Sequence, residues 1–338
     1  MKAAVLHAPD KLLIEDVPIP TIKEHEVLVQ MKASAVCGTD VSIYKGKIIP
    51  NAYPVIQGHE SAGVIAEVGK QVKRVKPGDH VIVNPAIFCG DCFCCLRGLQ
   101  NLCVNGGLLG RDLPGTFAEY VAVPESSLTL MPQHISFDDA SSLQALATVL
   151  RAWERMSVRP GDRVAVIGMG TTGLLHVRMA ALSGGEVYAI TRSRWRLDIA
   201  EQYGGRAIEA SKVNPVEAVM EATGGMGADL VIEAAGTQET HAQAIEMARP
   251  GGTVMLYGTL KQMEHFNTYL VYYKELTILG SRAMNRNGYE KAVALYSAGK
   301  LDLSPLITHR FHLADAAKMF DMVYDGSEKA LRVVCDFS

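Results

Sequence analysis

Three residues whose side chains can bind a transition metal occur near the start of the chain. Cys37 comes first, and His59 and Glu60 follow within the run Gly58-His59-Glu60-Ser61-Ala62-Gly63. One thiolate, one imidazole and one carboxylate suit a tetrahedral zinc ion that keeps a coordination position open for substrate. The pattern therefore predicts a catalytic zinc at these three residues. The alternative is that His59, flanked by glycine, is a buried turn residue.

A second group of cysteines has the spacing of a structural zinc site. Four thiolates in one short segment can surround a zinc ion and leave no open position; they are Cys89, Cys92, Cys95 and Cys103. Competing interpretations are a disulfide framework, an iron–sulfur cluster and a nucleic-acid-binding ribbon. A ribbon needs basic and aromatic neighbours, and between the outer cysteines only Arg97 and Phe93 are of those types. We predict a structural zinc, with Cys94 and Cys335 outside it.

A glycine-rich run has the context of a dinucleotide-binding turn. Gly168-Met169-Gly170-Thr171-Thr172-Gly173 follows the apolar segment Val164 to Ile167 and precedes a helical stretch to about Leu182. Such glycines allow a tight turn and a close approach of a pyrophosphate to the helix N-terminus. We expect contacts to the dinucleotide from Gly168, Gly170, Thr171, Thr172 and Gly173.

The end of the following strand, Val187 to Ile190, bears on the choice of cofactor. NAD-specific enzymes usually place an acidic residue there, whereas this chain has Thr191 followed by Arg192-Ser193-Arg194. With no carboxylate to repel it, a 2′-phosphate can be held by Arg192 or Arg194 through charge-assisted hydrogen bonds. We therefore expect NADP. The alternative is NAD, with the two arginines merely solvated.

The pattern of apolar residues changes along the chain. The first part indicates strands at Glu26 to Ala35, Gly63 to Val68, Val81 to Val83 and Phe117 to Val123. A helix is expected over Ala140 to Trp153. Short strands and helices then alternate, which predicts an α/β fold with a doubly wound parallel sheet; the strands expected are Arg163 to Ile167, Glu186 to Ile190, Asp229 to Glu233, Thr253 to Leu256 and Leu276 to Gly280. The last elements expected are helices near Tyr289 to Ser297 and Ala314 to Val323, and a strand near Leu331 to Asp336.

Composition agrees with an enzyme that acts on a small molecule. The 338 residues are 48% hydrophobic with a net charge of −3, too slight to attract nucleic acid or an anionic membrane. No apolar run has the length of a membrane span, and Met1-Lys2-Ala3-Ala4 does not begin a signal peptide. We therefore expect a cytoplasmic protein whose cysteines bind metal.

Taken together, these motifs resemble the zinc-containing medium-chain alcohol, polyol and sugar dehydrogenases. The most specific pieces are Cys37-Gly38-Thr39-Asp40, the segment from Gly58 to Gly69, the cysteine group and the run from Gly168 to Gly173. The resemblance implies a GroES-like zinc catalytic domain made of residues 1–145 and 283–338, with a Rossmann domain of residues 146–282 inserted in it. It also implies a homodimer or homotetramer.

The resemblance assigns further residues to the site. Gln144 matches the third protein ligand of the catalytic zinc, and Thr39 matches a hydroxyl that relays the substrate proton; Ser42 stands where relatives often have histidine. Other matching positions concern the cofactor: Thr148 beside the nicotinamide, Gly236 and Gly258 at strand ends, and Arg332 at the phosphates. Alternatives are that Gln144 faces away, that Thr39 is a helix N-cap and that Arg332 forms a surface ion pair.

The activity implied is zinc-dependent hydride transfer between a small secondary alcohol, polyol or sugar and NADP(H), with two zinc ions per chain. Because zinc lowers the pKa of a bound hydroxyl, it prepares an alcohol for loss of hydride. The resemblance is nearer to threonine, sorbitol and glucose dehydrogenases than to ethanol-oxidising enzymes. Two alternatives remain: a zinc-free NADPH-dependent quinone or alkenal reductase, and a nonenzymatic zinc-ribbon binding protein.

Overall fold

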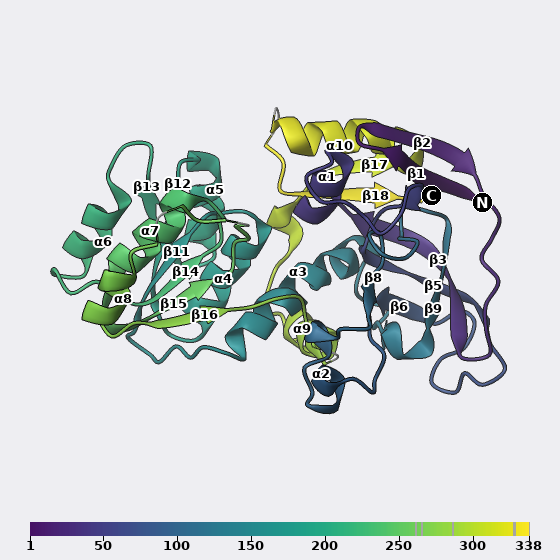
Figure 1. Ribbon diagram of the computed structural model, residues 1–338, viewed down its shortest axis with the longest axis horizontal. Coiled ribbons are helices and arrows are strands. Elements are labelled where there is room, and N and C mark those ends of the chain that lie inside the picture. The colour runs from purple at the N-terminus through teal and green to yellow at the C-terminus, as the bar shows by residue number, and fades with distance from the viewer. Residues whose placement is uncertain (261, 265, 286, 327–328, 338) are drawn as a thin grey trace. The chain divides into compact units, whose positions relative to one another are not determined.

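The computed structural model divides the chain into two compact units (Figure 1). It describes residues 1–260, 262–264, 266–285, 287–326 and 329–337. The first unit consists of Met1–Ala147 and Met284–Ser338, and the second of Thr148–Ala283. The boundaries expected from the sequence were 145/146 and 282/283. Among the described residues, no helix has both the length and the apolar character needed to cross a membrane.

The first unit is rich in β-structure. Its main sheet has the order β10-β6-β5-β3-β18-β17, and β9 also pairs with β3; the bounds are β3 Glu26–Ala35, β5 Glu60–Val68, β6 His80–Val83, β9 Tyr120–Pro124, β10 Leu128–Leu130, β17 Ile307–His312 and β18 Arg332–Asp336. Two small sheets complete it, β2-β1-β4 and β7-β8, with bounds β1 Lys2–Ala8, β2 Lys11–Asp16, β4 Val55–Ile56, β7 Ala86–Ile87 and β8 Gly107–Leu108.

The period-two pattern of β3 explains its central place. Val27, Val29 and Met31 alternate along the strand, are buried and belong to one apolar cluster. β3 pairs antiparallel with β5, and Ala35 lies opposite Glu60. Since Cys37 follows the end of one strand and His59 precedes the start of the other, this register brings the two residues to the same edge of the sheet.

Helices of the first unit carry several expected site residues. α1 (Gly38–Tyr44) follows Cys37, and α3 (Phe137–Trp153) carries Gln144. The short α2 (Phe93–Leu96) lies within the cysteine group. The remaining helices come from the second segment of the unit, α9 (Gly288–Ser297) and α10 (Ala316–Asp325).

The second unit is a parallel α/β domain. All neighbouring strands of its sheet are parallel, in the order β13-β12-β11-β14-β15-β16; the bounds are β11 Arg163–Ile167, β12 Glu186–Thr191, β13 Gly205–Glu209, β14 Ala228–Glu233, β15 Ala248–Leu256 and β16 Thr277–Gly280. Its helices are α4 Thr171–Leu182, α5 Arg194–Gln202, α6 Pro215–Ala222, α7 Gln238–Met247 and α8 Thr268–Tyr273. The strand order reverses between β11 and β14, where doubly wound sheets bind ligands at the carboxyl ends of the strands.

The expected elements are mostly present, with differences at particular ends. The strand expected over Phe117 to Val123 is wrong at its start, because β9 begins at Tyr120. Eight strands of the described residues have no counterpart in the sequence-based prediction: β1, β2, β4, β7, β8, β10, β13 and β17. β13 and β17 read GRAIE and ITHRFH, so neither has the continuous apolar run or clean alternation that marks a strand.

A histidine is fully buried in the second unit. His176 on α4 accepts a hydrogen bond at Nδ1 from Trp153 Nε1 over 3.1 Å, so its ring proton belongs on Nε2. Burial lowers the pKa of His176 to about 3. The folded protein therefore keeps this imidazole neutral at pH values where the unfolded chain would protonate it.

This buried imidazole should make the second unit less stable in acid. Between about pH 6.5 and 3, His176 is protonated in the unfolded chain and neutral in the folded chain. The free energy of unfolding therefore falls as pH decreases, by up to about 1.4 kcal/mol per pH unit from this group. Above about pH 6.5 this contribution is fully present. Urea unfolding followed by tryptophan fluorescence measures it, since Trp153 and Trp195 both lie in the second unit.

The matched variant is His176→Gln, which keeps a side-chain hydrogen-bond acceptor but cannot titrate. Its unfolding free energy should depend less steeply on pH between about 4 and 6 than that of the wild type. Equal slopes for the two proteins would contradict the assignment of the acid sensitivity to His176.

Candidate functional site

The structure brings three of the expected metal ligands together in the first unit. One ligand atom each from Cys37, His59 and Glu60 lies within 4.8 Å of the other two. His59 and Glu60 are buried, and Cys37 is half-buried. A thiol, an imidazole and a carboxylate at this separation fit the donor set of a zinc ion with an open position.

Asp40 orients two of the candidate ligands, Cys37 after the end of β3 and His59 before the start of β5. Its Oδ2 accepts a hydrogen bond from the Cys37 backbone N–H over 2.9 Å, and its Oδ1 lies 3.0 Å from His59 Nδ1. Oδ1 also accepts from the Gly58 N–H over 3.3 Å. Because Nδ1 of His59 donates to this carboxylate, Nε2 is the ring nitrogen that can bind a metal.

The electrostatics of the group favour a cation. Burial raises the pKa of the Cys37 thiol, the charge of Glu60 raises it further, and His59 acts in the opposite direction. For His59, burial disfavours the charged ring, yet the negative charges of Asp40 and Cys37 raise its pKa well above the ordinary value. Negative charges that stabilise a buried, protonated imidazole this strongly can also stabilise a divalent cation.

Arg332 lies beside Glu60, a position that the sequence did not indicate. It is 3% exposed, forms an ion pair with Glu60 Oε2, and donates from Nη2 to the Ser141 carbonyl over 3.2 Å. The alternative of a surface ion pair is therefore wrong, because both partners are buried. A role at the cofactor phosphates stays a prediction.

Gln144 is buried beside a tyrosine. It is 5% exposed, and its Oε1 accepts a hydrogen bond from the Tyr289 hydroxyl. Burial first, and then the charge of Glu60, raises the pKa of Tyr289 well above its ordinary value. Metal binding by Gln144 stays a prediction.

Thr39 is not the N-cap of a helix. α1 begins at Gly38 and Cys37 is its N-cap, which places Thr39 inside the first turn. The N-cap interpretation is therefore wrong by two positions, since the helix starts directly after the metal-binding cysteine. Thr39 and Ser42 are both half-buried on α1, and their role as a proton relay stays a prediction.

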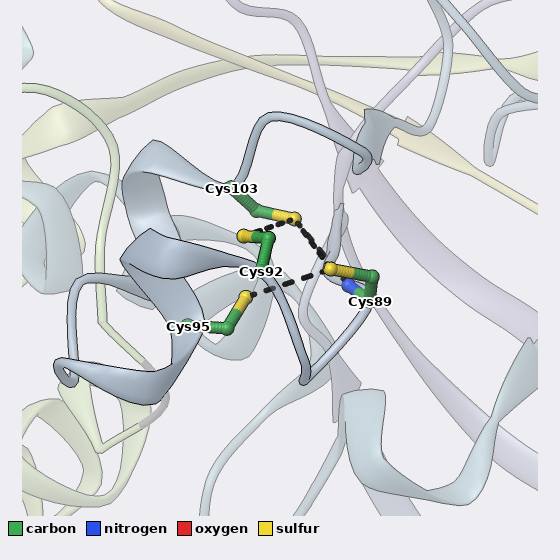
Figure 2. A group of neighbouring side chains, drawn as sticks. All are labelled: Cys89, Cys92, Cys95 and Cys103. Carbon is green, nitrogen blue, oxygen red and sulfur yellow. Dashed lines mark hydrogen bonds between the residues drawn. The ribbon is translucent and has the colours of Figure 1, made fainter.

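The four cysteines of the second group converge, as Figure 2 shows. The sulfur of Cys103 lies 3.5 Å from that of Cys89 and 3.8 Å from that of Cys92, and the sulfurs of Cys89 and Cys95 are 4.0 Å apart. Four sulfurs at about 2.3 Å from a tetrahedral zinc would be separated by about 3.8 Å. All of these cysteines are free, so the disulfide interpretation is wrong.

One thiol of this group is acidic enough to be a thiolate at neutral pH. Backbone N–H groups of Cys95 and Val104 lower the pKa of Cys92 to about 6. Burial raises the pKa of Cys95 to about 12. Zinc binds thiolates, so a zinc ion at this group would displace the protons of the thiols that are still protonated. The four cysteines therefore suit a zinc site.

The glycine-rich turn forms an open cradle at the start of α4. Gly170 is the N-cap, and a Cβ on it would meet no atom within 4 Å. By contrast, a Cβ on Gly173 would lie 1.8 Å from the Gly168 carbonyl oxygen. Gly173 is thus needed for packing, whereas Gly170 leaves room where helix N–H groups can bind phosphate.

Two more turns lie at the carboxyl ends of β14 and β15. A Cβ on Gly258 would lie 2.4 Å from the Gly236 nitrogen, so the two turns approach backbone to backbone. Glu233 holds the first turn, its Oε1 accepting from the Gly236 N–H over 2.8 Å. Thr148 Oγ1 is 2.7 Å from the hydroxyl of Tyr257, a residue of the second turn that sequence reasoning missed.

The two arginines after β12 differ in their surroundings. Arg194 pairs with Asp198 over 2.8 Å and also with Glu201, so its charge is already balanced by carboxylates of α5. Arg192 is exposed and forms no ion pair within the described part of the chain. Thr191 is the last residue of β12.

Fold and site together define a two-domain oxidoreductase with a GroES-like and a Rossmann domain. Residues 23–133 match the family model of the alcohol dehydrogenase GroES-like domain, and residues 171–298 match the model called zinc-binding dehydrogenase. The chain belongs to the zinc-containing medium-chain alcohol and polyol dehydrogenases.

Individual relatives agree with this family. L-threonine 3-dehydrogenase of Bacillus subtilis is 35% identical over 93% of this chain and 92% of its own length. A zinc-binding dehydrogenase of Sinorhizobium meliloti bound to NADP has a TM-score of 0.93 and 30% identity, covering 99% of each chain. An Escherichia coli alcohol dehydrogenase in complex with NADH has a TM-score of 0.93 and 28% identity, covering 100% of this chain and 99% of its own.

Proposed function

We propose that this protein is a zinc-dependent dehydrogenase that transfers hydride between a small secondary alcohol, polyol or sugar and NADP(H). The observation that carries the proposal is the convergence of Cys37, His59 and Glu60 in the first unit, in a chain whose second unit has an open glycine cradle. We propose that Cys89, Cys92, Cys95 and Cys103 bind a second, structural zinc.

Within the catalytic group, each residue has a distinct task. A bound zinc supplies Lewis-acid activation of the substrate hydroxyl, and the nicotinamide accepts the hydride. Cys37, His59, Glu60 and Gln144 offer the ligand atoms for the metal. Asp40 keeps His59 in the tautomer that can bind it. Arg332 balances the charge of Glu60, which leaves a less anionic group around the metal. Thr39 and Ser42 pass the substrate proton outward.

A substrate screen tests the activity. Secondary alcohols, polyols and aldoses are assayed with NADP and with NAD, before and after chelation of zinc. We expect turnover with at least one of these substrates, a preference for NADP and loss of activity on chelation. Activity that survives chelation on quinones or alkenals would instead support a zinc-free reductase. The proposal extends to a homodimer or homotetramer, which the resemblance alone supports.

The preference for NADP depends on Arg192 more than on Arg194. Because Arg194 is already paired with two carboxylates, Arg192→Ala should raise the Kd for NADPH about tenfold, while Arg194→Ala should change it less. The Kd for NADH should stay the same in both variants. Fluorescence titration with each reduced cofactor measures these values.

Two results would count against this account of specificity. One is a wild-type protein that binds NADH more tightly than NADPH. The other is an Arg192→Ala variant that loses affinity for both cofactors equally, since that would place the arginine away from the 2′-phosphate.

A further inference from the structure

Tyr289 makes a contact that the proposed reaction does not yet use. Its side chain is fully buried on α9, and its hydroxyl donates to Gln144 Oε1. We propose that Tyr289 is a positioning residue that holds the Gln144 carboxamide in the orientation in which its oxygen can bind the catalytic zinc. The inference rests on the proposed function, because it assumes a zinc at Cys37 and His59.

The tyrosine hydroxyl lies beside β6, the neighbour of the strand that carries Glu60. It is 3.5 Å from the Val83 carbonyl oxygen, and Val83 of β6 is opposite Ser61 of β5, the residue after Glu60. A hydrogen bond to Tyr289 therefore keeps Gln144 near the metal-binding end of β5.

A second set of contacts places Gln144 in the same region. Arg332 pairs with Glu60 and also donates to the carbonyl of Ser141. Ser141 precedes Gln144 by three residues on α3, and residues three apart share one face of a helix. Gln144 is thus tied toward Glu60 from two directions, and Glu60 offers a ligand atom within 4.8 Å of those of Cys37 and His59.

The Gln144 carboxamide needs a partner that fixes its orientation, and the Tyr289 hydroxyl is that partner. A glutamine can bind zinc only through its oxygen, and rotation of the amide by half a turn would present the NH2 group instead. An amide oxygen has two lone pairs, so it can accept from Tyr289 and still bind a metal. A glutamate at the same position would need no such help, because either of its oxygens can act as the ligand.

Zinc affinity of the whole chain tests this role. Tyr289→Phe removes only the hydroxyl, and loss of a hydrogen bond to a metal ligand typically weakens metal binding 10–100-fold. We therefore expect the affinity of the first site to fall about 10–100-fold in a chelator competition titration, with the cysteine group as an internal reference that keeps its zinc. Tyr188→Phe is the matched control, since Tyr188 is equally buried and donates to the Ala222 carbonyl in the second unit.

Two further variants separate positioning from a general effect on folding. In a Gln144→Leu background, Tyr289→Phe should no longer change the affinity of the first site. In a Tyr289→Phe background, Gln144→Glu should restore it, because a carboxylate presents an oxygen in either orientation. If Tyr289→Phe does not fold, Gln144→Leu can still overturn the proposal, since a first site that keeps its zinc affinity without the carboxamide needs no residue to position it.

Each failure has a separate meaning. Unchanged zinc affinity in Tyr289→Phe or in Gln144→Leu, or an equal loss from Tyr289→Phe with and without Gln144, would overturn the role of Tyr289. A wild-type chain that binds zinc only at the cysteine group would instead overturn the proposed function.

Discussion

Replacement of Cys37 by serine is expected to lower kcat/KM at least about 1000-fold, which corresponds to about 4 kcal/mol of lost transition-state stabilisation. Cys37 is the only thiol in the cluster formed with His59 and Glu60 among the described residues. A serine hydroxyl at that position does not supply the anionic sulfur that zinc favours, so the first site should lose its metal. Steady-state kinetics and metal analysis of the same preparation measure both effects.

A control within the cysteine group sharpens this test. Cys94 lies on α2 next to Cys95 but is not one of the four cysteines that converge. Cys94→Ser should keep two zinc ions and full activity, whereas Cys37→Ser should keep one zinc and almost no activity. If Cys37→Ser keeps both metals and its turnover, the catalytic zinc is not where we place it.

Substitution by alanine of two glycines in the same turn should have different consequences, a loss of cofactor affinity for Gly170 and a loss of stability for Gly173. Gly170→Ala adds a methyl group to open space at the α4 N-terminus, where φ is −73°, so stability should change by less than about 1 kcal/mol. The same methyl group occupies the room proposed for the pyrophosphate, and the Kd for NADPH should rise at least about tenfold. Gly173→Ala forces a Cβ against the Gly168 carbonyl and should destabilise the second unit by about 3 kcal/mol.

Thermal unfolding followed by tryptophan fluorescence and titration with NADPH distinguish the two variants. A Gly170→Ala variant that binds NADPH as well as the wild type would show that the phosphates do not approach this helix N-terminus. A Gly173→Ala variant as stable as the wild type would contradict the close packing of the turn.

Apolar runs and glycine turns could be recognised from the sequence, because they depend on residues that are close together in the chain. The strand expected over Arg163 to Ile167 matches β11 at both ends, because a strand buried on both faces of a parallel sheet is a continuous apolar run. The turn from Gly168 to Gly173 was recognised for a similar reason, since a positive φ at Gly168 and the lack of room for a Cβ at Gly173 both require glycine. The doubly wound sheet followed from the alternation of these elements.

Contacts between distant residues could not be predicted from the sequence. Nothing in the printed chain links Glu60 with Arg332, or Gln144 with Tyr289, because these pairs form only when β18 and α9 pack into the first unit. Asp40 was noticed only as part of a motif, although its carboxylate holds Cys37, Gly58 and His59 together. The discontinuous first domain was likewise expected from the resemblance and not from periodicity.

A zinc-edge anomalous diffraction map of fully metallated crystals, with turnover measured on the same preparation, tests whether a catalytic zinc lies at Cys37 and His59. We expect two peaks per chain, one among Cys89, Cys92, Cys95 and Cys103 and one bonded to Cys37 and His59 at about 2.0–2.3 Å. A map with a peak only at the four cysteines, from a preparation with undiminished turnover, would contradict it.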